Sequence, residues 1–240
     1  MTKILAIETA SEACSATLQI SHESDSQVYS RIETTPRQHA KLILSMLDEV
    51  LEDGGIALSD IDAVAFGRGP GAFTGLRIAA GVAQGVALSV DKRVVPVSTL
   101  AALARQTLDD NNKKVIVAMD ARMGEVYWAV FKNNDGEVEL IGEEQVSKPQ
   151  EMFDKATANL EDEAQVLAVG SGWDVYKDEL FANGKPKNLI HLENKFPTAL
   201  DIASLAVPLF EAGNAAVKPE DAQPVYIRND VAKKSAKQSS

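Results

Sequence analysis

The sequence predicts an α/β protein made of two similar subdomains. Short apolar runs typical of buried strands alternate with longer segments of helical periodicity. The order then restarts, because the run Ile4–Glu8 returns as Ile116–Asp120, and each run ends in an acidic residue before a turn and a returning strand. The run Ala65–Gly69 likewise returns as Ala168–Gly172, a strand that enters glycines ahead of a helix. Two similarities in the same order favour a duplication over a chance likeness between short strands.

In the first half, three strands come first and helices then alternate with strands. The first helix follows Pro36, keeps its apolar residues at helical spacing and ends at Gly54 and Gly55. Ser98 or Thr99 is expected to cap the last helix. The expected elements are strands at Lys3–Glu8, Cys14–Ile20 and Gln27–Thr34, a helix at Arg37–Glu52, a strand at Ala63–Phe66, a helix at Phe73–Val90, a strand at Val94–Val97 and a helix ending near Leu108.

The second half repeats this order and ends in a polar tail. The turn Asn134–Gly136 is expected to join two of its strands as a hairpin. Residues 229–240 contain lysines and serines, and we expect them to form a disordered tail. The expected elements are strands at Ile116–Asp120, Glu125–Phe131 and Val138–Val146, a helix at Pro149–Asn159, a strand at Ala168–Val169, a helix at Trp173–Phe181, a strand at Leu189–Leu192, a helix at Thr198–Glu211 and an extended segment at Pro219–Arg228.

One stretch, residues 62–90, joins a glycine-rich loop to an unusually apolar helix. Glycine allows backbone angles that other residues avoid, and proline fixes one angle and lacks an amide donor. The loop is therefore expected to be a rigid, sharp turn. Its residues are Gly67, Arg68, Gly69, Pro70 and Gly71.

The helix after this loop carries apolar residues on every side, so it must be buried on more than one side. Gly71 and Gly75, and again Gly81 and Gly85, lie four residues apart and leave bare backbone along a face. In a chain this short, one covering layer is the protein's own sheet and the other could be a second protein. An ordinary two-layer core is the alternative, and this stretch alone leaves both open.

Composition and charge limit the possible functions. The chain has 240 residues, 45% of them hydrophobic and 25% charged, as expected of a soluble globular protein with one large domain or two small ones. Its net charge of −11 disfavours direct binding to nucleic acid and favours a basic partner. The single cysteine, Cys14, indicates a reducing cytoplasm. Neither a membrane helix nor a signal peptide is expected, because Met1–Lys3 leads directly into a strand.

The glycine-rich loop does not match a nucleotide-binding motif. It lacks the lysine of the Walker pattern. The dinucleotide pattern is nearly met by Gly67, Gly69 and Ala72, but Pro70 removes an amide that could face a pyrophosphate, and Asp91 precedes the next strand instead of ending it. Only the free amides at the helix start are expected to favour an anion.

The sequence is also poor in metal-binding and nucleophilic residues. No two of its histidines have the spacing of a ligand pair. Glu8 and Asp120 are expected to accept hydrogen bonds from turn amides at the ends of their strands. Cys14 has no neighbouring base and is expected to be a core residue. The histidines are His22, His39 and His191.

Three stretches together resemble one protein family. They are ILAIETASEACSATL (4–18), RQHAKLILSMLDEVLEDGG (37–55) followed by DAVAFGRGPGAFTGLRIAAGVAQGVAL (62–88), and AMDARMGEVYWAVF (118–131). These stretches resemble the bacterial TsaB (YeaZ) family, whose members take part in the synthesis of threonylcarbamoyladenosine on tRNA. The resemblance covers about residues 1–132, with GRGPGAFTGLRIA as its most specific run, and Pro224–Arg228 resembles the family's closing segment.

This resemblance implies the actin-like/sugar-kinase/Hsp70 superfold, a duplicated βββαβαβα arrangement with subdomains at residues 1–110 and 111–228. It implies a cytoplasmic, non-catalytic subunit without a cofactor, which pairs with a catalytic TsaD-type subunit and is joined by a TsaE-type ATPase. TsaD transfers the threonylcarbamoyl group to an adenosine next to the tRNA anticodon, so this chain would meet tRNA only indirectly. The chain lacks the metal-binding histidine pair of TsaD, because Ile43 follows His39 four residues on.

The resemblance also places the partner surface on the two helices of the first half, with a homodimer possible through the same helices. Ala80→Glu or Ala83→Glu is then expected to block pairing without unfolding the monomer. The alternative is a stand-alone ATP-binding or metallopeptidase-like enzyme of the same superfold, which would need glycine-rich phosphate turns or histidine ligands. The residues expected in the interface are His39, Ile43, Met46, Leu47, Val50, Phe73, Gly75, Leu76, Arg77, Ala79, Ala80, Gly81, Val82, Ala83, Val86 and Ala87.

Overall fold

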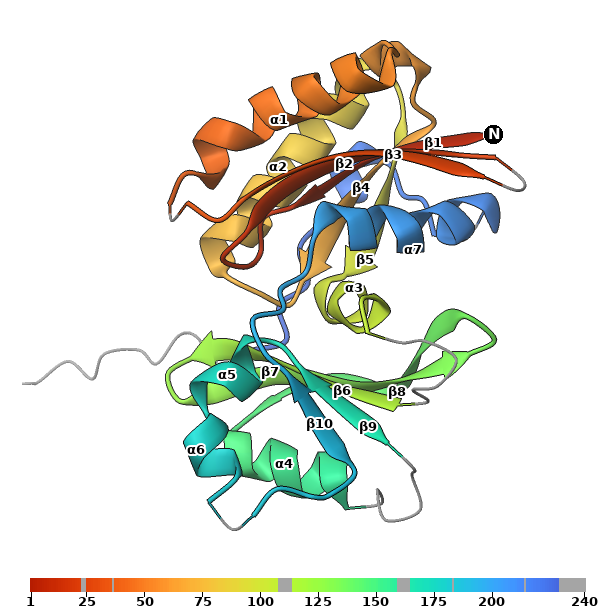
Figure 1. Ribbon diagram of the computed structural model, residues 1–240. Coiled ribbons are helices and arrows are strands. Elements are labelled where there is room, and N and C mark those ends of the chain that lie inside the picture. The colour runs from red at the N-terminus through yellow and green to blue at the C-terminus, as the bar shows by residue number, and fades with distance from the viewer. Residues whose placement is uncertain are drawn as a thin grey trace, which may run out of the picture.

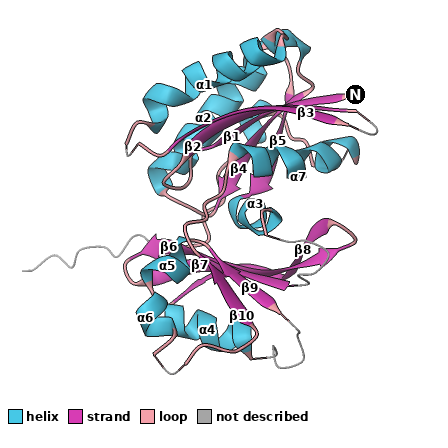
Figure 2. Ribbon diagram, viewed as in Figure 1, coloured by secondary structure: helices cyan, strands magenta, loops and turns pink. Residues whose placement is uncertain are grey.

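Two five-stranded mixed sheets form the two halves of the molecule, one above the other in Figure 1. Helices cover the outer face of each sheet, and two further helices lie between the sheets (Figure 2). The computed structural model describes residues 1–22, 25–35, 37–107, 114–158, 165–182, 184–213 and 215–228. The expected tail at 229–240, Pro36, and the expected helix ends at Leu108 and Asn159 lie outside these residues.

The first sheet is formed by β1 (Thr2–Glu8), β2 (Cys14–Ser21), β3 (Ser26–Glu33), β4 (Ala63–Gly69) and β5 (Arg93–Ser98). Its spatial order is β3–β2–β1–β4–β5. The first three strands are antiparallel neighbours, whereas β4 lies parallel to β1 and β5 parallel to β4. Apolar residues follow one another in β1 and β4 because both faces of these central strands are buried.

The second sheet is formed by β6 (Lys114–Arg122), β7 (Glu125–Asn134), β8 (Glu137–Ser147), β9 (Val166–Val169) and β10 (Leu189–Leu192). Its order, β8–β7–β6–β9–β10, repeats that of the first sheet with the same strand directions. Ile4 pairs with Ala63 in the first sheet, and Ile116 pairs with Ala168 in the second. The predicted duplication is therefore confirmed, and the repeated strand order is that of the predicted actin-like superfold.

The outer face of the first sheet is covered by α1 (His39–Gly54) and α2 (Phe73–Ser89). In α1, apolar side chains at helical spacing pack onto the sheet, and the helix ends at Gly55, whose φ of 64° allows its amide to bond back to the last turn. Helix α1 begins at His39 and not at Arg37 as predicted, because Arg37 has a φ of 60° that no α-helix accepts.

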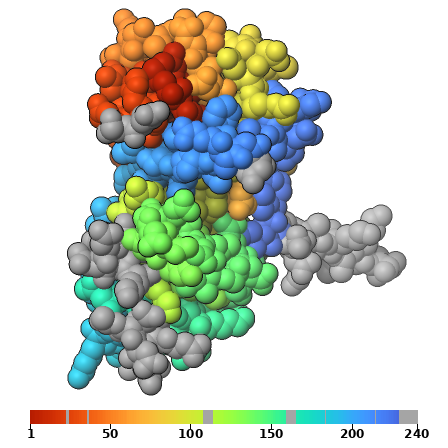
Figure 3. Space-filling model, turned by 90° about the vertical axis from the view of Figure 1, so that its right-hand side faces the viewer, coloured from red at the N-terminus to blue at the C-terminus, as the bar shows by residue number. Residues whose placement is uncertain are grey.

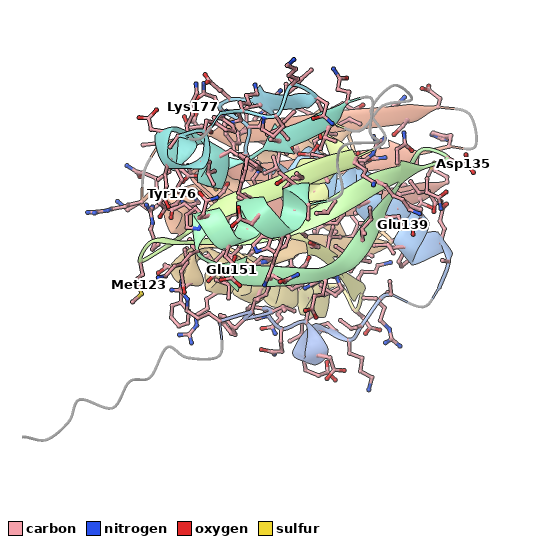
Figure 4. All side chains as sticks on the ribbon, turned by 90° about the horizontal axis from the view of Figure 1, so that it is seen from below. Met123, Asp135, Glu139, Glu151, Tyr176 and Lys177 are labelled. Carbon is pink, nitrogen blue, oxygen red and sulfur yellow. The ribbon has the colours of Figure 1, made fainter. Side chains whose placement is uncertain are left out.

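The outer face of the second sheet is covered by α4 (Pro149–Thr157), α5 (Ser171–Val175) and α6 (Lys177–Leu180). Figure 4, seen from below, shows α4, which carries the labelled Glu151, in front of the strands of this sheet. One helix was predicted over Trp173–Phe181, but α5 and α6 are separate. Tyr176 interrupts them with a φ of −105° and a ψ of 18°.

Two helices, α3 (Thr99–Arg105) and α7 (Ala199–Glu211), lie between the sheets. Leu100 and Leu103 of α3 pack with the core of the second sheet. Helix α7 comes from the second half of the chain, yet Ile202 and Ala206 pack against Ile4 and the other inner residues of the first sheet. The second subdomain was expected to extend to residue 228, but α7 belongs to the core of the first half.

Residues 215–228 also return to the first half. Val217 forms an isolated antiparallel bridge with Val94 of β5, and Gln84 of α2 donates a 3.0 Å hydrogen bond to the Ala222 carbonyl. In Figure 3 blue atoms from the C-terminal part of the chain accordingly lie among the red, orange and yellow atoms of the first half in the upper body. The second sheet and its outer helices, about residues 114–192, thus form an insertion before the chain returns.

The predicted glycine-rich loop is partly strand. Gly67, Arg68 and Gly69 continue β4, because Gly67 pairs with Val97 and Gly69 pairs with Ser98 around a bulge at Arg68. The sharp turn is confined to Pro70 and Gly71, and the Gly69–Pro70 peptide is cis. Among the described residues, no helix combines the length and apolar character needed to cross a membrane.

Two glycines of α2, Gly75 near its start and Gly81 at its middle, offer a matched test of packing. A Cβ at Gly75 would lie 2.0 Å from the Thr9 carbonyl oxygen, whereas a Cβ at Gly81 would meet no atom within 4 Å. Both substitutions improve helix propensity by about 1 kcal/mol. We therefore expect Gly81→Ala to raise the free energy of unfolding by about 1 kcal/mol and Gly75→Ala to lower it by about 2 kcal/mol. Urea unfolding of the two variants measures this difference, and equal effects would contradict the packing described here.

Candidate partner surface and inter-subdomain cleft

The α2 helix has one buried face and one exposed face, although its sequence is apolar on both. Ala79, Ala83 and Ala87 are completely buried against the first sheet. Gly81 and Gly85, each two residues from a buried alanine, lie on the opposite side and are exposed. The predicted burial on more than one side is therefore absent from the single chain, and the outer face of α2 is available to a partner.

Ten of the sixteen residues expected in the interface are buried in the chain's own core. Their side chains pack on the first sheet or on its connections, so they cannot contact a partner directly without unfolding. Ala80→Glu and Ala83→Glu, suggested as interface tests, would place a carboxylate in this core and are unsuitable. The buried residues are Ile43, Met46, Leu47, Val50, Gly75, Leu76, Ala79, Ala80, Ala83 and Ala87.

The remaining six residues do form one exposed or half-buried surface along α2 and the start of α1. They are His39, Phe73, Arg77, Gly81, Val82 and Val86. Gly85, which was noted in the sequence but not included among the expected interface residues, follows Gly81 one helical turn later on the same exposed side of α2. A Cβ at Gly81 or Gly85 would meet open space, so these two glycines expose the helix backbone itself. We call the exposed side of α2 that is formed by Gly81, Val82, Gly85 and Val86 the glycine face.

An aromatic cluster stands at the start of α2, where the glycine face ends. The Phe73 side chain is 56% exposed and its ring centroid lies 5.7 Å from that of Tyr226. The Arg77 guanidinium carbon lies 3.9 Å from the centroid of the Phe73 ring, and its Nε donates to the Tyr226 hydroxyl at 3.4 Å. Stacking on the ring holds Arg77 in place.

The glycine-rich segment of β4 connects the two halves of the molecule. The Val225 amide donates to the Arg68 carbonyl oxygen at 2.7 Å. The Arg68 guanidinium pairs at 3.3 Å with Glu144 of β8, which also accepts a hydrogen bond from the Ser98 hydroxyl. A Cβ at Gly69 would lie 2.9 Å from the Val225 carbonyl oxygen, so a larger residue would displace the C-terminal segment. This segment therefore holds the C-terminal segment against the first half.

A cleft of about 1000 Å³ lies between the two halves, at the carboxyl ends of β1 and β6. Its walls come from the turn after β1, the starts of α1 and α2, the β6–β7 hairpin, α5 and the C-terminal segment. The lining residues are Ala10, Ser11, Glu12, Thr34, Arg37, His39, Gly71, Ala72, Phe73, Met119, Asp120, Ala121, Arg122, Tyr127, Ser171, Tyr226 and Arg228.

The acid at the end of β1 is sealed beneath this cleft. Glu8 is completely buried, its Oε1 accepts a 2.5 Å hydrogen bond from the Ala10 amide, and its Oε2 accepts one from the Thr99 hydroxyl at 3.4 Å. Burial raises the pKa of Glu8 from 4.5 to about 7, and the hydrogen bonds oppose this rise. A Cβ at Gly67 would lie 1.9 Å from Oε2, so the glycine makes room for the carboxyl group.

The acid at the end of β6 is engaged in the same way. Asp120 Oδ1 accepts the Arg122 amide at 2.9 Å, Oδ2 accepts Arg122 Nη1 at 2.9 Å, and the Asp120 amide donates to Ser171 Oγ at 3.1 Å. The prediction that both acids accept turn amides is confirmed. A nucleotide phosphate held by these turns would need the Ala10 and Arg122 amides, which Glu8 and Asp120 already occupy. A magnesium nucleotide therefore does not fit the two turns.

The other predicted chemical groups are also found in structural positions. Cys14 is buried beside Met46, and burial raises its pKa to about 11, so the thiol stays protonated at neutral pH. His39 Nε2 lies 3.1 Å from the Ser11 carbonyl oxygen and connects the start of α1 to the turn after β1. Within the described residues, no three His, Cys, Asp or Glu side chains come together as metal ligands would.

Comparison with known proteins identifies the family. The TsaB protein of Escherichia coli (strain K12), a tRNA threonylcarbamoyladenosine biosynthesis protein by name, is 39% identical to this chain over 96% of each sequence. The chain belongs to the TsaB family. The TsaB protein of Haemophilus influenzae is 35% identical over 95% of this chain and 94% of its own. The predicted resemblance to TsaB is confirmed.

Two further comparisons agree with this family. The solved structure of YeaZ from Pseudomonas aeruginosa has a TM-score of 0.81 and 39% sequence identity, covering 94% of this chain and 100% of its own. A family model described as TsaD, tRNA N6-adenosine threonylcarbamoyltransferase, matches residues 26–235. The chain therefore also belongs to the wider family that this model describes. The TsaB proteins are the relatives that match it along nearly its whole length.

Sequence analysis did not single out the arginines of the cleft. Arg37, Arg122 and Arg228 lie far apart in the chain and line the same cleft only in the folded structure. The exposure of Gly81 could have been found in the sequence. Positions two apart on a helix face opposite sides, and the buried face carries Ala79 and Ala83.

The raised pKa of Glu8 predicts a specific pH dependence. Between about pH 4.5 and 7 the folded protein keeps the Glu8 proton while the unfolded chain loses it, so the free energy of unfolding falls as the pH rises through this range. The loss amounts to about 3 kcal/mol. Glu8→Gln removes this titration and keeps the shape, so its stability relative to the wild type should rise from pH 4.5 to pH 7.

Urea unfolding of both proteins at a series of pH values measures this difference. Glu137→Gln, at an exposed position of β8, is the control and should show no comparable rise. A constant difference between Glu8→Gln and the wild type across the range would mean that Glu8 does not titrate there.

Proposed function

We propose that the chain is a non-catalytic subunit required for threonylcarbamoyl transfer to the adenosine next to the tRNA anticodon. It binds and activates a TsaD-type catalytic subunit, and a TsaE-type ATPase joins the complex. The proposal is supported by the names of the TsaB relatives, which are described as tRNA threonylcarbamoyladenosine biosynthesis proteins. The chain acts in the cytoplasm and meets tRNA through its partner.

The glycine face of α2 is the observation that carries this proposal. A glycine inside a helix costs about 1 kcal/mol relative to alanine. Among the described residues, Gly81 and Gly85 have no neighbour that a Cβ would touch, so the packing of the described fold gives no reason for them. Bare backbone lets another helix approach closely, and the half-buried Val82 and Val86 beside it supply apolar contact. We therefore assign the TsaD-type subunit to this face.

The arrangement of the two strand-end acids supports a non-catalytic role. Glu8 is sealed in the core, and Asp120 is neutralised by Arg122, so each acid serves its own turn. The chain's contribution is then to present a rigid helical surface to the catalytic subunit. The same face is also open to a second copy of this chain, in a symmetric homodimer that competes with the heterodimer.

The first experiment is size-exclusion chromatography with light scattering, on the chain alone and mixed with its TsaD-type partner, followed by a modification assay on unmodified tRNA. We expect a one-to-one complex and modification only when both proteins are present. ATP hydrolysis or peptidase activity by this chain alone, without a complex, would favour the alternative of a stand-alone enzyme.

Substitutions on the glycine face test the surface itself. Gly81→Glu and Gly85→Glu should leave the monomer folded, because both positions face open space and glutamate favours helix over glycine. Burial of an unpaired carboxylate in the interface should weaken pairing with the TsaD-type subunit by about 100-fold or more. Titration of the labelled partner measures this affinity.

Ala158→Glu, at the exposed C-terminal end of α4 on the second subdomain, is the matched control and should pair normally. A homodimer formed through the glycine face should dissociate in the Gly81→Glu variant under the same conditions. Normal heterodimer affinity in both glycine variants would remove α2 from the interface.

A further inference from the structure

The first sheet has an unprotected edge at β3. This strand pairs with β2 along its whole length, from Ser26 to Glu33, without a bulge. On its other side, no backbone group among the described residues forms a hydrogen bond with β3. The strand has eight residues and is therefore about 27 Å long. Its outward amide and carbonyl groups form a row with which another strand can pair.

The other edges of the two described sheets are protected. Strand β5 contains Pro96, and Val217 pairs with its outer side. Strand β10 has only four residues. Strand β8 shifts its register with β7 around Gly142 and carries several glutamates, including the Glu139 labelled in Figure 4. Proline, short length, bulges and charge keep edge strands from pairing, whereas β3 contains no proline, no lysine and no bulge.

The inner face of β3 carries two apolar side chains that the chain leaves exposed. Ile32 pairs with Ser15 of β2, whose hydroxyl accepts a 2.8 Å hydrogen bond from the Ala199 amide of α7, so Ile32 lies on the α7 side of the sheet. Val28 lies four residues earlier on the same side. The Ile32 and Val28 side chains are 48% and 41% exposed, and neither belongs to the described cores of the first half. Figure 1 shows these strands between α1 above and α7 below.

The inner face of β3 is self-complementary in antiparallel pairing. A twofold axis perpendicular to the sheet at Ser30 would bring residues equally far from Ser30 opposite each other. Val28 of one copy then meets Ile32 of the second copy, and the two Ser30 side chains meet at the axis. Directly opposed apolar pairs stabilise antiparallel sheets. The pairing would therefore cover both exposed apolar side chains of each copy.

The outer face of β3 fits the same register. Tyr29 lies opposite Arg31 of the second copy, and Gln27 lies opposite Glu33 of the second copy. An aromatic ring beside a guanidinium group attracts it, and a side-chain amide can donate to a carboxylate. Each charged residue of the strand thus meets a favourable partner.

Neighbouring registers bring like charges together. The axis must pass through a residue, because side chains that lie directly opposite share one face of the sheet. An axis at Tyr29 would place Glu33 opposite Asp25, and an axis at Arg31 would place the two Arg31 side chains opposite each other. Like charges in these positions destabilise the pair. Axes further from the centre leave much of the strand unpaired, so the sequence favours the axis at Ser30.

We propose that β3 is a self-association surface, through which two copies of this chain join their first sheets into one continuous sheet by antiparallel pairing about Ser30. The glycine face stays free in this dimer, because α2 packs on β4, and β2 and β1 lie between β4 and β3. The edge dimer is therefore distinct from a dimer through the glycine face, and it does not depend on the function proposed above.

Sedimentation equilibrium of the full-length Gly81→Glu variant tests this dimer, because that substitution blocks the glycine face and leaves β3 unchanged. We expect a monomer–dimer equilibrium in the micromolar range, as is typical of small interfaces. Ile32→Lys in the same background should weaken the dimer at least tenfold, because it places a charge opposite Val28. Ile190→Lys, which changes a 37% exposed isoleucine on the short edge strand β10, is the matched control and should leave the dimer intact.

Circular dichroism checks that each variant is folded. Equal dimerisation of the Ile32→Lys and Ile190→Lys variants would overturn the proposal. A monomer at every concentration would also overturn it, and would leave the edge to an extended segment of another protein.

Cysteine cross-linking tests the register with less change to the strand. Ser30→Cys places two thiols opposite each other at the axis, within reach of a disulfide. Ser26→Cys, at another exposed serine of β3, places them about 27 Å apart, because each lies four residues from the axis. Mild oxidation should therefore cross-link the Ser30→Cys protein at least tenfold faster. The native Cys14 is buried in both variants. Equal rates would indicate random collision and would overturn the proposal.

Discussion

The close approach of the turn after β1 to the connection between β4 and α2 determines much of this structure. Gly67, Gly71 and Gly75 all face that turn, and a Cβ on any of them would collide with Glu8, Ala10 or Thr9. The contact brings the start of α2 onto the first sheet and closes the core over the Glu8 carboxyl group. Glycines in this segment therefore serve contact between backbones, and phosphate binding is not needed to explain them.

The orientation of α2 follows from that contact. With Gly75 against the Thr9 carbonyl group, the alanine face must lie on the sheet and the glycine face must point outward. The same helix start brings Phe73 to the cleft, where it meets Tyr226 from the C-terminal segment. One backbone contact thus positions two surfaces that are open to other molecules, although they differ in chemistry. The glycine face is apolar, whereas the cleft is concave and lined by three arginines.

Most of the fold could be predicted from the sequence, because strand and helix periodicity and the duplicated order are local patterns. The return of α7 to the first sheet could not, since its apolar residues would suit either sheet equally well. The interface prediction included buried residues such as Ala80 and Ala83, because small apolar residues occupy both sides of α2 and the sequence does not distinguish the two sides. The cleft depends on residues brought together only by tertiary structure, such as Arg37 and Arg228.

The position of α7 has a consequence for how the protein is made. The inner face of the first sheet, including Ile4 and Ala65, is covered mainly by residues 199–207. During synthesis these strands leave the ribosome long before the helix that covers them. The apolar inner face of the sheet therefore stays uncovered until nearly the whole chain has been made. A nascent chain in this state is exposed to aggregation. The last fifth of the sequence therefore completes the first half of the protein, and truncated or stalled chains are natural clients for chaperones.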